Sequence, residues 1–236
     1  MTTHMPVLVL MPGMDGTGEL FAPLLAALDA RVETIVVRYP YYRSLDYAGL
    51  IPIARASLPA GRPFVIVAES FSGPIGISLA AERPRGLRGL ALCGTFARNP
   101  RPMLAGIARW SQSIPMNDVL ARIALSAMLG TGAGPSLRAH VEQTVRSIPH
   151  EVLRARLGAV LRVDVSRELA LVDAPILYLQ ASRDRAVPPS AANLIRRIRP
   201  DTKLVRVDAP HFLLQVAANA AAVELERFAA SVSAEH

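Results

Sequence analysis

The stretch Phe64-Val-Ile-Val-Ala-Glu-Ser70-Phe-Ser-Gly-Pro-Ile-Gly76 carries the most information about the fold of this chain. An apolar run typical of a buried strand ends at Ala68, and a run with helical spacing and small residues begins directly after Ser70. A serine on such a sharp strand-to-helix turn has its Oγ lifted clear of the sheet, and small neighbours let the turn close. The usual pattern is Gly-x-Ser-x-Gly, whereas this chain has Ala68 and Ser72 at the glycine positions and Gly73 one place later. The stretch predicts an exposed serine on a strand-turn-helix unit.

Apolar runs recur along the chain, with helical patterns between them. We expect strands at Val7–Met11, Thr34–Arg38, Phe64–Ala68, Gly89–Cys93, Ile176–Gln180 and Lys203–Val207. We expect helices at Glu19–Leu28, Leu45–Leu58, Pro74–Glu82, Ala191–Ile198 and Phe212–Val232. Strands that are continuously apolar are typical of parallel strands covered on both faces. The alternation of strands and helices predicts an α/β fold with a doubly wound, mostly parallel sheet.

One long interval, between Cys93 and Ile176, interrupts this alternation and shows no convincing strand. Helical patterns occur in it at Pro102–Gln112, Asp118–Leu129, Leu137–Ser147 and Glu151–Val163. An insertion that carries its own helices is often a lid. We therefore expect a core made of residues 1–95 and 166–236, with a helical cap at 96–165 inserted in the second half of the fold. A second independent domain is disfavoured, because the chain returns to the same sheet.

The composition limits the functional classes. The chain has 236 residues, half of them hydrophobic, which suits one domain with a full core. Its one cysteine, Cys93, excludes an internal disulfide and a cysteine-rich metal site, and the five histidines lack metal-ligand spacing. We expect neither a metal nor a cofactor. No apolar run is long enough for a bilayer, and the N-terminal residues do not resemble a signal peptide, so a cytoplasmic location is expected.

The net charge of +7 comes almost entirely from arginine, because Lys203 is the only lysine. A nucleic-acid-binding protein would show a clustered basic face with interleaved aromatic residues. The arginines are scattered instead, so no nucleic-acid partner is expected. A basic rim that attracts an acidic substrate or an acidic carrier protein remains open.

Candidate catalytic residues follow three of the expected strands. A serine nucleophile needs a base, and the base needs an orienting carboxylate. Functional groups of a parallel α/β sheet gather at the carboxyl ends of its strands. Asp184 and His211 each lie a few residues beyond a strand end, and the order Ser70, Asp184, His211 is that of elbow-type serine enzymes. We expect Ser70 as nucleophile, His211 as base and Asp184 as orienter. Asp208, closer in sequence to His211, is the alternative orienter.

Acyl transfer also needs donors aimed at the developing oxyanion. One is expected to be the backbone N–H of Phe71, because N–H groups at a helix start are free. The other is expected from the glycine-rich segment Met11–Gly18, by position the N–H of Met14, with Gly13 and Asp15 of this segment contacting the substrate. The alternative of a phosphate-binding loop is weaker, because the Gly-Lys-Ser/Thr sequence is missing.

Together these segments resemble the α/β-hydrolase family. The resemblance covers nearly the whole chain: the segment Met11–Gly18, the turn around Ser70, the loop with Asp184, and His211 in Ala-Pro-His-Phe. In that family the residue after Gly13 commonly donates to the oxyanion, which supports Met14. The family inserts its cap after the fourth strand, as expected here. The pattern is similar to small bacterial carboxylesterases and to pimeloyl-carrier-protein methyl ester esterases.

The resemblance implies a serine hydrolase that cleaves carboxylic esters of small molecules through an acyl-enzyme. An alternative is hydrolysis or transfer of acyl groups, as thioesters or methyl esters, carried by an acyl carrier protein. A third alternative, of another class, is a non-catalytic ligand-binding relative. Candidates for an acyl-chain pocket in the cap, or else for packing within the cap, are Met103, Leu104, Trp110, Met116, Leu120 and Met128.

Overall fold

The computed structural model describes residues 5–103 and 125–233. Its strands are β1 (Val7–Met11), β2 (Thr34–Val36), β3 (Phe64–Glu69), β4 (Leu87–Cys93), β5 (Ile176–Ala181) and β6 (Lys203–Val207). They form one sheet in the order β2-β1-β3-β4-β5-β6, and every neighbouring pair is parallel. The predicted doubly wound parallel sheet is confirmed.

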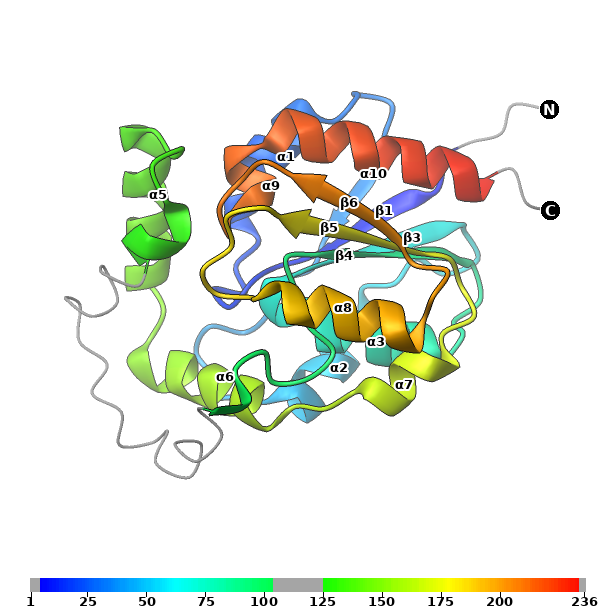
Figure 1. Ribbon diagram of the computed structural model, residues 1–236, viewed down its shortest axis with the longest axis horizontal. Coiled ribbons are helices and arrows are strands. Elements are labelled where there is room, and N and C mark those ends of the chain that lie inside the picture. Colours follow the sequence, from blue (N-terminus) through cyan, green and yellow to red (C-terminus); the bar gives the residue numbers. More distant parts are fainter. Residues whose placement is uncertain (1–4, 104–124, 234–236) are drawn as a thin grey trace.

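Helices cover both faces of this sheet (Figure 1). One face carries α1 (Ala22–Ala27), α9 (Leu213–Val216) and α10 (Ala218–Ser233), and the other carries α2 (Tyr47–Ala56), α3 (Gly73–Ala81), α7 (Ser166–Leu171) and α8 (Pro189–Ile198). Helices lie on both faces because the chain winds in two directions from β1: it goes first to the edge strand β2, then returns past β1 to β3 and continues to β6. Such a reversal places a crevice at the carboxyl ends of the strands, where ligands bind in open α/β sheets.

The strand sequences explain the two-layered core. Along β1, Val9 packs into the core layer under α2 and α3, whereas its neighbours Leu8 and Leu10 pack into the layer under α1 and α10. Successive side chains of a strand point to opposite faces. Because both faces are covered, both sets must be apolar, which is why the strands read as continuous hydrophobic runs.

Some element boundaries differ from the predicted ones. The first predicted helix begins as a short 3-10 helix, η1 (Glu19–Phe21), before α1, and the last one divides into α9 and α10. Helix α8 begins at Pro189, earlier than predicted, because proline is favourable in the first turn of a helix. Strand β2 ends early because the chain turns toward the β1 exit loop, where the Tyr39 N–H donates to Gly16 O at 2.7 Å.

The insertion leaves and rejoins the core through a narrow antiparallel neck. Asn99 N–H donates to Val163 O at 2.9 Å, and Val165 N–H donates to Ala97 O at 2.8 Å. Beyond the neck, the insertion contains α5 (Pro135–Arg146) and α6 (His150–Arg162), which lie on the side toward which the arrowheads of β5 and β6 point (Figure 1). The predicted helix Pro102–Gln112 and most of Asp118–Leu129 fall outside the described residues.

Helix α7 was not expected from the sequence. It has six residues, too few to show a helical periodicity, and it packs against α3 and α8 of the core. Over the described ranges, no helix is both long and apolar enough to cross a membrane.

Candidate active site

Ser70 lies on the sharp turn between β3 and α3. Its φ of 46° is in the left-handed region, which non-glycine residues seldom adopt. A short 3-10 helix, η2 (Ser70–Ser72), connects the strand to α3. Thr95, which follows β4, stabilises the turn because its hydroxyl donates a hydrogen bond to the Ser70 carbonyl. Strained backbone of this kind clusters at functional sites.

The modified glycine pattern of the turn has a steric explanation. A Cβ on Gly73 would lie 1.9 Å from Thr95 Oγ1, and a Cβ on Gly76 would lie 2.8 Å from the Ala68 Cβ. Helix α3 therefore has no side chain at the two points where it approaches Thr95 and Ala68. The glycines that the usual pattern places beside the serine are replaced by glycines further along the helix.

Three loops at the carboxyl ends of β3, β5 and β6 bring Ser70, Asp184 and His211 together. Ser70 Oγ lies 2.8 Å from His211 Nε2, and His211 Nδ1 lies 2.8 Å from Asp184 Oδ2. The other carboxylate oxygen, Oδ1, accepts the backbone N–H groups of Ala186 and Val187, each at 2.8 Å. With Nδ1–H directed at the carboxylate, Nε2 presents a lone pair to the Ser70 hydroxyl.

Burial adds to this geometry. The side chains of His211 and Asp184 are 8% and 5% exposed. In such a site, water competes little for their hydrogen bonds, and the two backbone donors compensate the buried carboxylate.

Asp208, the alternative orienter, lies elsewhere. Its carboxylate accepts the Ser182 hydroxyl at 2.9 Å and pairs with Arg183 at 3.2 Å, and its side chain is 84% exposed. Asp208 therefore lies on the surface of its loop, and the carboxylate that contacts the His211 imidazole is that of Asp184.

The exit loop of β1 is tightly folded. Gly16 N–H donates to Gly13 O at 3.1 Å, and the Asp15 carboxylate accepts the backbone N–H and the hydroxyl of Thr17 at 2.9 and 2.7 Å. Asp15 is 6% exposed, and these hydrogen bonds of its carboxylate are made within the loop. Gly16 has a φ of 73°, which accounts for a glycine there. Met14, the predicted donor, lies between these fixed points.

Phe71, the other predicted oxyanion donor, is anchored by its ring. The side chain is 1% exposed and stacks on Tyr47, with 4.8 Å between the ring centroids. The residue directly after Ser70 is thus held by packing of α2 against the turn.

Two functional candidates were missed from the sequence, Glu69 and Arg156. Glu69 directly precedes Ser70 yet is 7% exposed, and its Oε1 accepts Gln215 Nε2 at 2.9 Å. Burial raises the pKa of Glu69 to about 7. The sequence did contain one signal for Glu69, namely a carboxylate at the end of an otherwise apolar strand. Arg156, on α6, is completely buried against the β1 exit loop, and nothing in the sequence distinguishes it from neighbouring arginines.

The predicted cap residues are only partly within the described ranges. Met128 packs with the buried residues Leu125, Leu129 and Val141, which is packing within the insertion and against Leu20. Met103 is 96% exposed, so it does not line an apolar pocket in this structure. Leu104, Trp110, Met116 and Leu120 lie outside the described residues.

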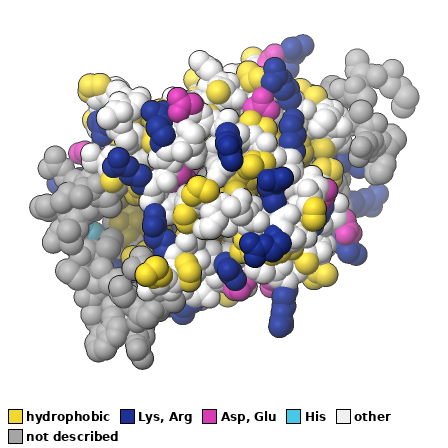
Figure 2. All heavy atoms as spheres, viewed as in Figure 1, with side chains coloured by type: hydrophobic (Ala, Val, Ile, Leu, Met, Phe, Trp, Pro, Cys, Tyr) yellow, Lys and Arg dark blue, Asp and Glu magenta, His cyan; other side chains and the backbone are white. Residues whose placement is uncertain are grey.

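A cavity of about 590 Å³ lies beside the loops that carry Asp184 and His211. Pro210, which directly precedes His211, lines it together with Gly130 and Thr131 of the insertion. Three arginines line it as well: Arg138, Arg183 and Arg185. Basic side chains are otherwise dispersed over the face shown in Figure 2.

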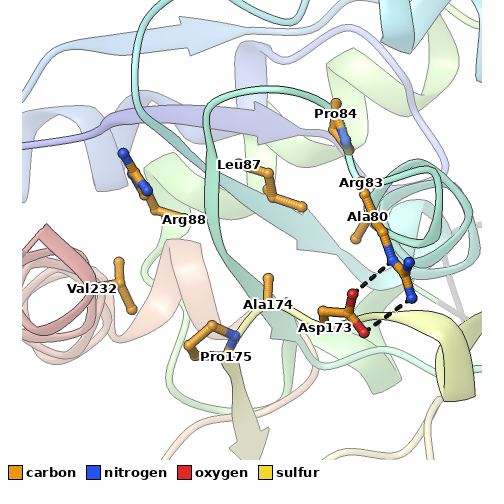
Figure 3. Close-up of a pocket in the computed structure, with 9 residues that line it drawn as sticks. All are labelled: Ala80, Arg83, Pro84, Leu87, Arg88, Asp173, Ala174, Pro175 and Val232. Carbon is orange, nitrogen blue, oxygen red and sulfur yellow. Dashed lines mark hydrogen bonds and ion pairs between the residues drawn. The ribbon is translucent and has the colours of Figure 1, made fainter. Parts of the chain in front are cut away.

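A second hollow, of about 430 Å³, lies at the opposite end of the sheet, between the first residue of β4, Leu87, and Pro175, which precedes β5 (Figure 3). Arg83 and Asp173 pair across one side of it at 2.6 Å. It is distant from the carboxyl ends of the strands. Within residues 5–103 and 125–233, no group of three His, Cys, Asp or Glu side chains is arranged to hold a metal ion.

Comparison with known proteins decides the family. The sequence profile described as the alpha/beta hydrolase family matches residues 8–225. The chain belongs to this family. Its fold is accordingly the α/β-hydrolase fold, here with a six-stranded parallel sheet and a helical insertion.

Two sequence relatives show the range of the family. A pimeloyl-[acyl-carrier protein] methyl ester esterase from Xanthomonas campestris is 27% identical over 227 residues, which cover 87% of each chain. A Klebsiella pneumoniae protein that carries the name of a carbamate hydrolase, RutD, is 27% identical over 230 residues, covering 86% of this chain and 82% of the relative. The names of these two relatives refer to different substrates, a methyl ester and a carbamate. The likeness therefore supports hydrolysis as the reaction and does not single out one substrate.

A solved structure agrees with the fold. The enol-lactonase of Burkholderia xenovorans superposes with a TM-score of 0.79 at 20% identity, covering 95% of this chain and 91% of that chain. The distant resemblance to pimeloyl-carrier-protein methyl ester esterases is confirmed.

Proposed function

We propose that this hydrolase cleaves carboxylic esters through a covalent acyl-enzyme formed on Ser70. The observation that carries the proposal is the continuous hydrogen-bonded chain from Ser70 Oγ through the His211 imidazole to the Asp184 carboxylate. Family membership alone is a weaker argument, since members of one fold differ in chemistry.

The chemistry follows from this geometry in two steps. Ser70 Oγ attacks the ester carbonyl while its proton passes to His211 Nε2, and the tetrahedral oxyanion accepts the N–H groups of Met14 and Phe71. His211 then protonates the leaving alcohol, and the acyl group remains on Ser70. Water, deprotonated by His211, attacks the acyl-enzyme and releases the acid. Asp184 keeps the imidazole in the required tautomer and stabilises the imidazolium.

Ser70→Ala tests the proposal. The purified protein is expected to hydrolyse p-nitrophenyl esters, and a series from acetate to decanoate would identify the acyl length it prefers. A fluorophosphonate should label the wild type once, at Ser70, and the variant not at all. Unchanged ester hydrolysis by Ser70→Ala would overturn the role of Ser70. A wild type that neither reacts nor is labelled would favour the non-catalytic, ligand-binding alternative.

The arginine-lined cavity favours a second candidate substrate. Its acyl group carries a negative charge at the far end, or is borne on an acidic carrier protein. Arg183 and Arg185 flank Asp184 on its loop, and Arg138 faces the same cavity from the insertion. Arg183 is shared with the exposed Asp208 carboxylate and Arg138 also donates to backbone carbonyls, and an anionic group would add charge-assisted hydrogen bonds to these arginines and to Arg185. Methyl hydrogen adipate, a monoester with a free carboxylate, should then have a lower KM than neutral methyl hexanoate, and the advantage should shrink with salt.

The matched variant for this second candidate is Arg185→Gln. It should remove the preference for the charged ester while leaving turnover of the neutral ester unchanged. Equal KM values for both esters in the wild type would refute an anionic substrate and leave the neutral-ester proposal intact.

A further inference from the structure

Arg156 is a fully buried guanidinium that reaches from the inserted helix α6 into the β1 exit loop. It is 0% exposed, in a helix whose other arginines are at least partly exposed. Its Nη1 donates to both Met14 O and Asp15 O, each at 2.7 Å, and its Nη2 donates to Pro40 O at 3.1 Å. A charge this deeply buried is costly unless its surroundings compensate it.

The compensation comes from the β1 exit loop and from the segment that follows β2. Three backbone carbonyls accept from the guanidinium, and its Cζ lies 5.9 Å from the centroid of the Tyr39 ring. Burial lowers the pKa of Arg156, and the nearby Asp15 carboxylate opposes that effect. A guanidinium loses its proton only at very high pH, so the charge persists and must stay paired with these acceptors.

Two of the Arg156 hydrogen bonds are made to residues at and beside Met14, whose N–H is the proposed oxyanion donor. The Met14 and Asp15 carbonyls are consecutive, so one nitrogen fixes two successive peptide planes. Gly16 lies directly under the guanidinium, since a Cβ there would be 2.5 Å from Nη1. The N–H of this same Gly16 holds the Gly13 carbonyl, and the Gly13 carbonyl shares its peptide unit with the Met14 N–H.

We propose that Arg156 is a positioning residue that holds the Met14 N–H in place to donate to the oxyanion, acting through the carbonyls of Met14 and Asp15 and through Gly16. The inference rests on the proposed acyl transfer. It makes the insertion part of the catalytic machinery, because α6 supplies the group that orders a loop of the core. An oxyanion donor acts only if it is ordered before the charge develops.

The test compares Arg156→Met and Arg156→Lys with Arg162→Met, a matched control at an exposed position of the same helix. One oxyanion donor contributes roughly 10²–10³ in kcat. With loss of its positioning, we expect kcat to fall about 10- to 100-fold in Arg156→Met, with KM within about twofold of the wild type. Lysine keeps the charge but not the planar fork, so Arg156→Lys should be intermediate. Arg162→Met should match the wild type.

A second readout separates positioning from general damage. A trifluoromethyl ketone forms a tetrahedral adduct on Ser70 with its oxygen in the oxyanion hole, so its Ki should rise in parallel with the loss of kcat. The Ki of the product acid, which forms no such adduct, should stay unchanged. Equal losses of affinity for both inhibitors, or a kcat no lower than that of Arg162→Met, would overturn the inference.

If Arg156→Met does not fold, as judged by circular dichroism, the same comparison made with Arg156→Lys decides the matter. The proposed function fails in a different way: the wild type would then lack activity and fluorophosphonate labelling. An active wild type with an unaffected Arg156 variant would refute only the positioning role.

Discussion

Replacing Gly73 by alanine is expected to destabilise the turn that carries Ser70. The added Cβ would lie 1.9 Å from Oγ1, 2.7 Å from Cγ2 and 2.8 Å from Cβ of Thr95. Favourable contacts between heavy atoms need about 3.5–4.0 Å. Thr95 is 0% exposed and therefore has little room to move away.

Two effects set the magnitude. Overpacking a buried contact costs about 1–3 kcal/mol. Rotation of Thr95 relieves only part of this cost, because its own Cβ stays 2.8 Å from the added Cβ, and rotation also takes the hydroxyl away from the Ser70 carbonyl; the unsatisfied buried group costs roughly 1–3 kcal/mol in addition. Alanine recovers at most ~1 kcal/mol of helix propensity at this first helical position. We therefore expect Gly73→Ala to lower the free energy of unfolding by about 3 kcal/mol.

Urea unfolding followed by circular dichroism measures this effect, and a double-mutant cycle with Thr95→Ala assigns it. Removing Oγ1 and Cγ2 leaves one close contact, at 2.8 Å, so the double variant should be more stable than the sum of the single effects predicts, by about 1–2 kcal/mol. Gly134→Ala is the control, because no atom lies within 4 Å of its added Cβ. Two results would refute this steric account. One is a loss below 0.5 kcal/mol, roughly the scatter of surface substitutions; the other is strict additivity in the cycle.

Three further predictions concern titratable groups. Burial raises the pKa of Glu69 from 4.5 to about 7, so between these pH values the unfolded chain loses a proton that the folded chain keeps, and stability falls as pH rises. Glu69→Gln should remove up to about 3 kcal/mol of this fall, measured by urea unfolding at pH 5 and pH 8, and an identical pH dependence in the variant would count against it. Asp184→Asn should lower kcat by about 10⁴-fold in ester hydrolysis with the fold retained, and a loss below tenfold would contradict its role as orienter. Burial raises the pKa of the Cys93 thiol, so a thiol reagent such as DTNB should find no reactive group in the native protein and one after unfolding, and rapid native reaction would contradict this.

The sequence predicted the architecture because the relevant physics is local. A strand buried on both faces must be apolar throughout, so runs such as Val7–Met11 and Phe64–Ala68 could be recognised without the structure. The order of Ser70, Asp184 and His211 after successive strands was equally visible, because parallel strands end at one edge of the sheet. Boundaries were less certain: α7 is too short to show periodicity, and α8 begins earlier than its apolar pattern.

Only the tertiary structure decided which polar groups meet. The choice of Asp184 over Asp208 depends on where two loops place their carboxylates around one imidazole, which no spacing along the chain encodes. Likewise, Arg156 resembles the other arginines of its helix in sequence, yet it alone fills the space above Gly16. Contacts between residues more than a hundred positions apart arise from packing of whole elements. The sequence by itself therefore determined the sheet, the elbow and the candidate triad, and the packing of α6 on the β1 exit loop determined that Arg156 contacts the segment around Met14, the proposed oxyanion donor.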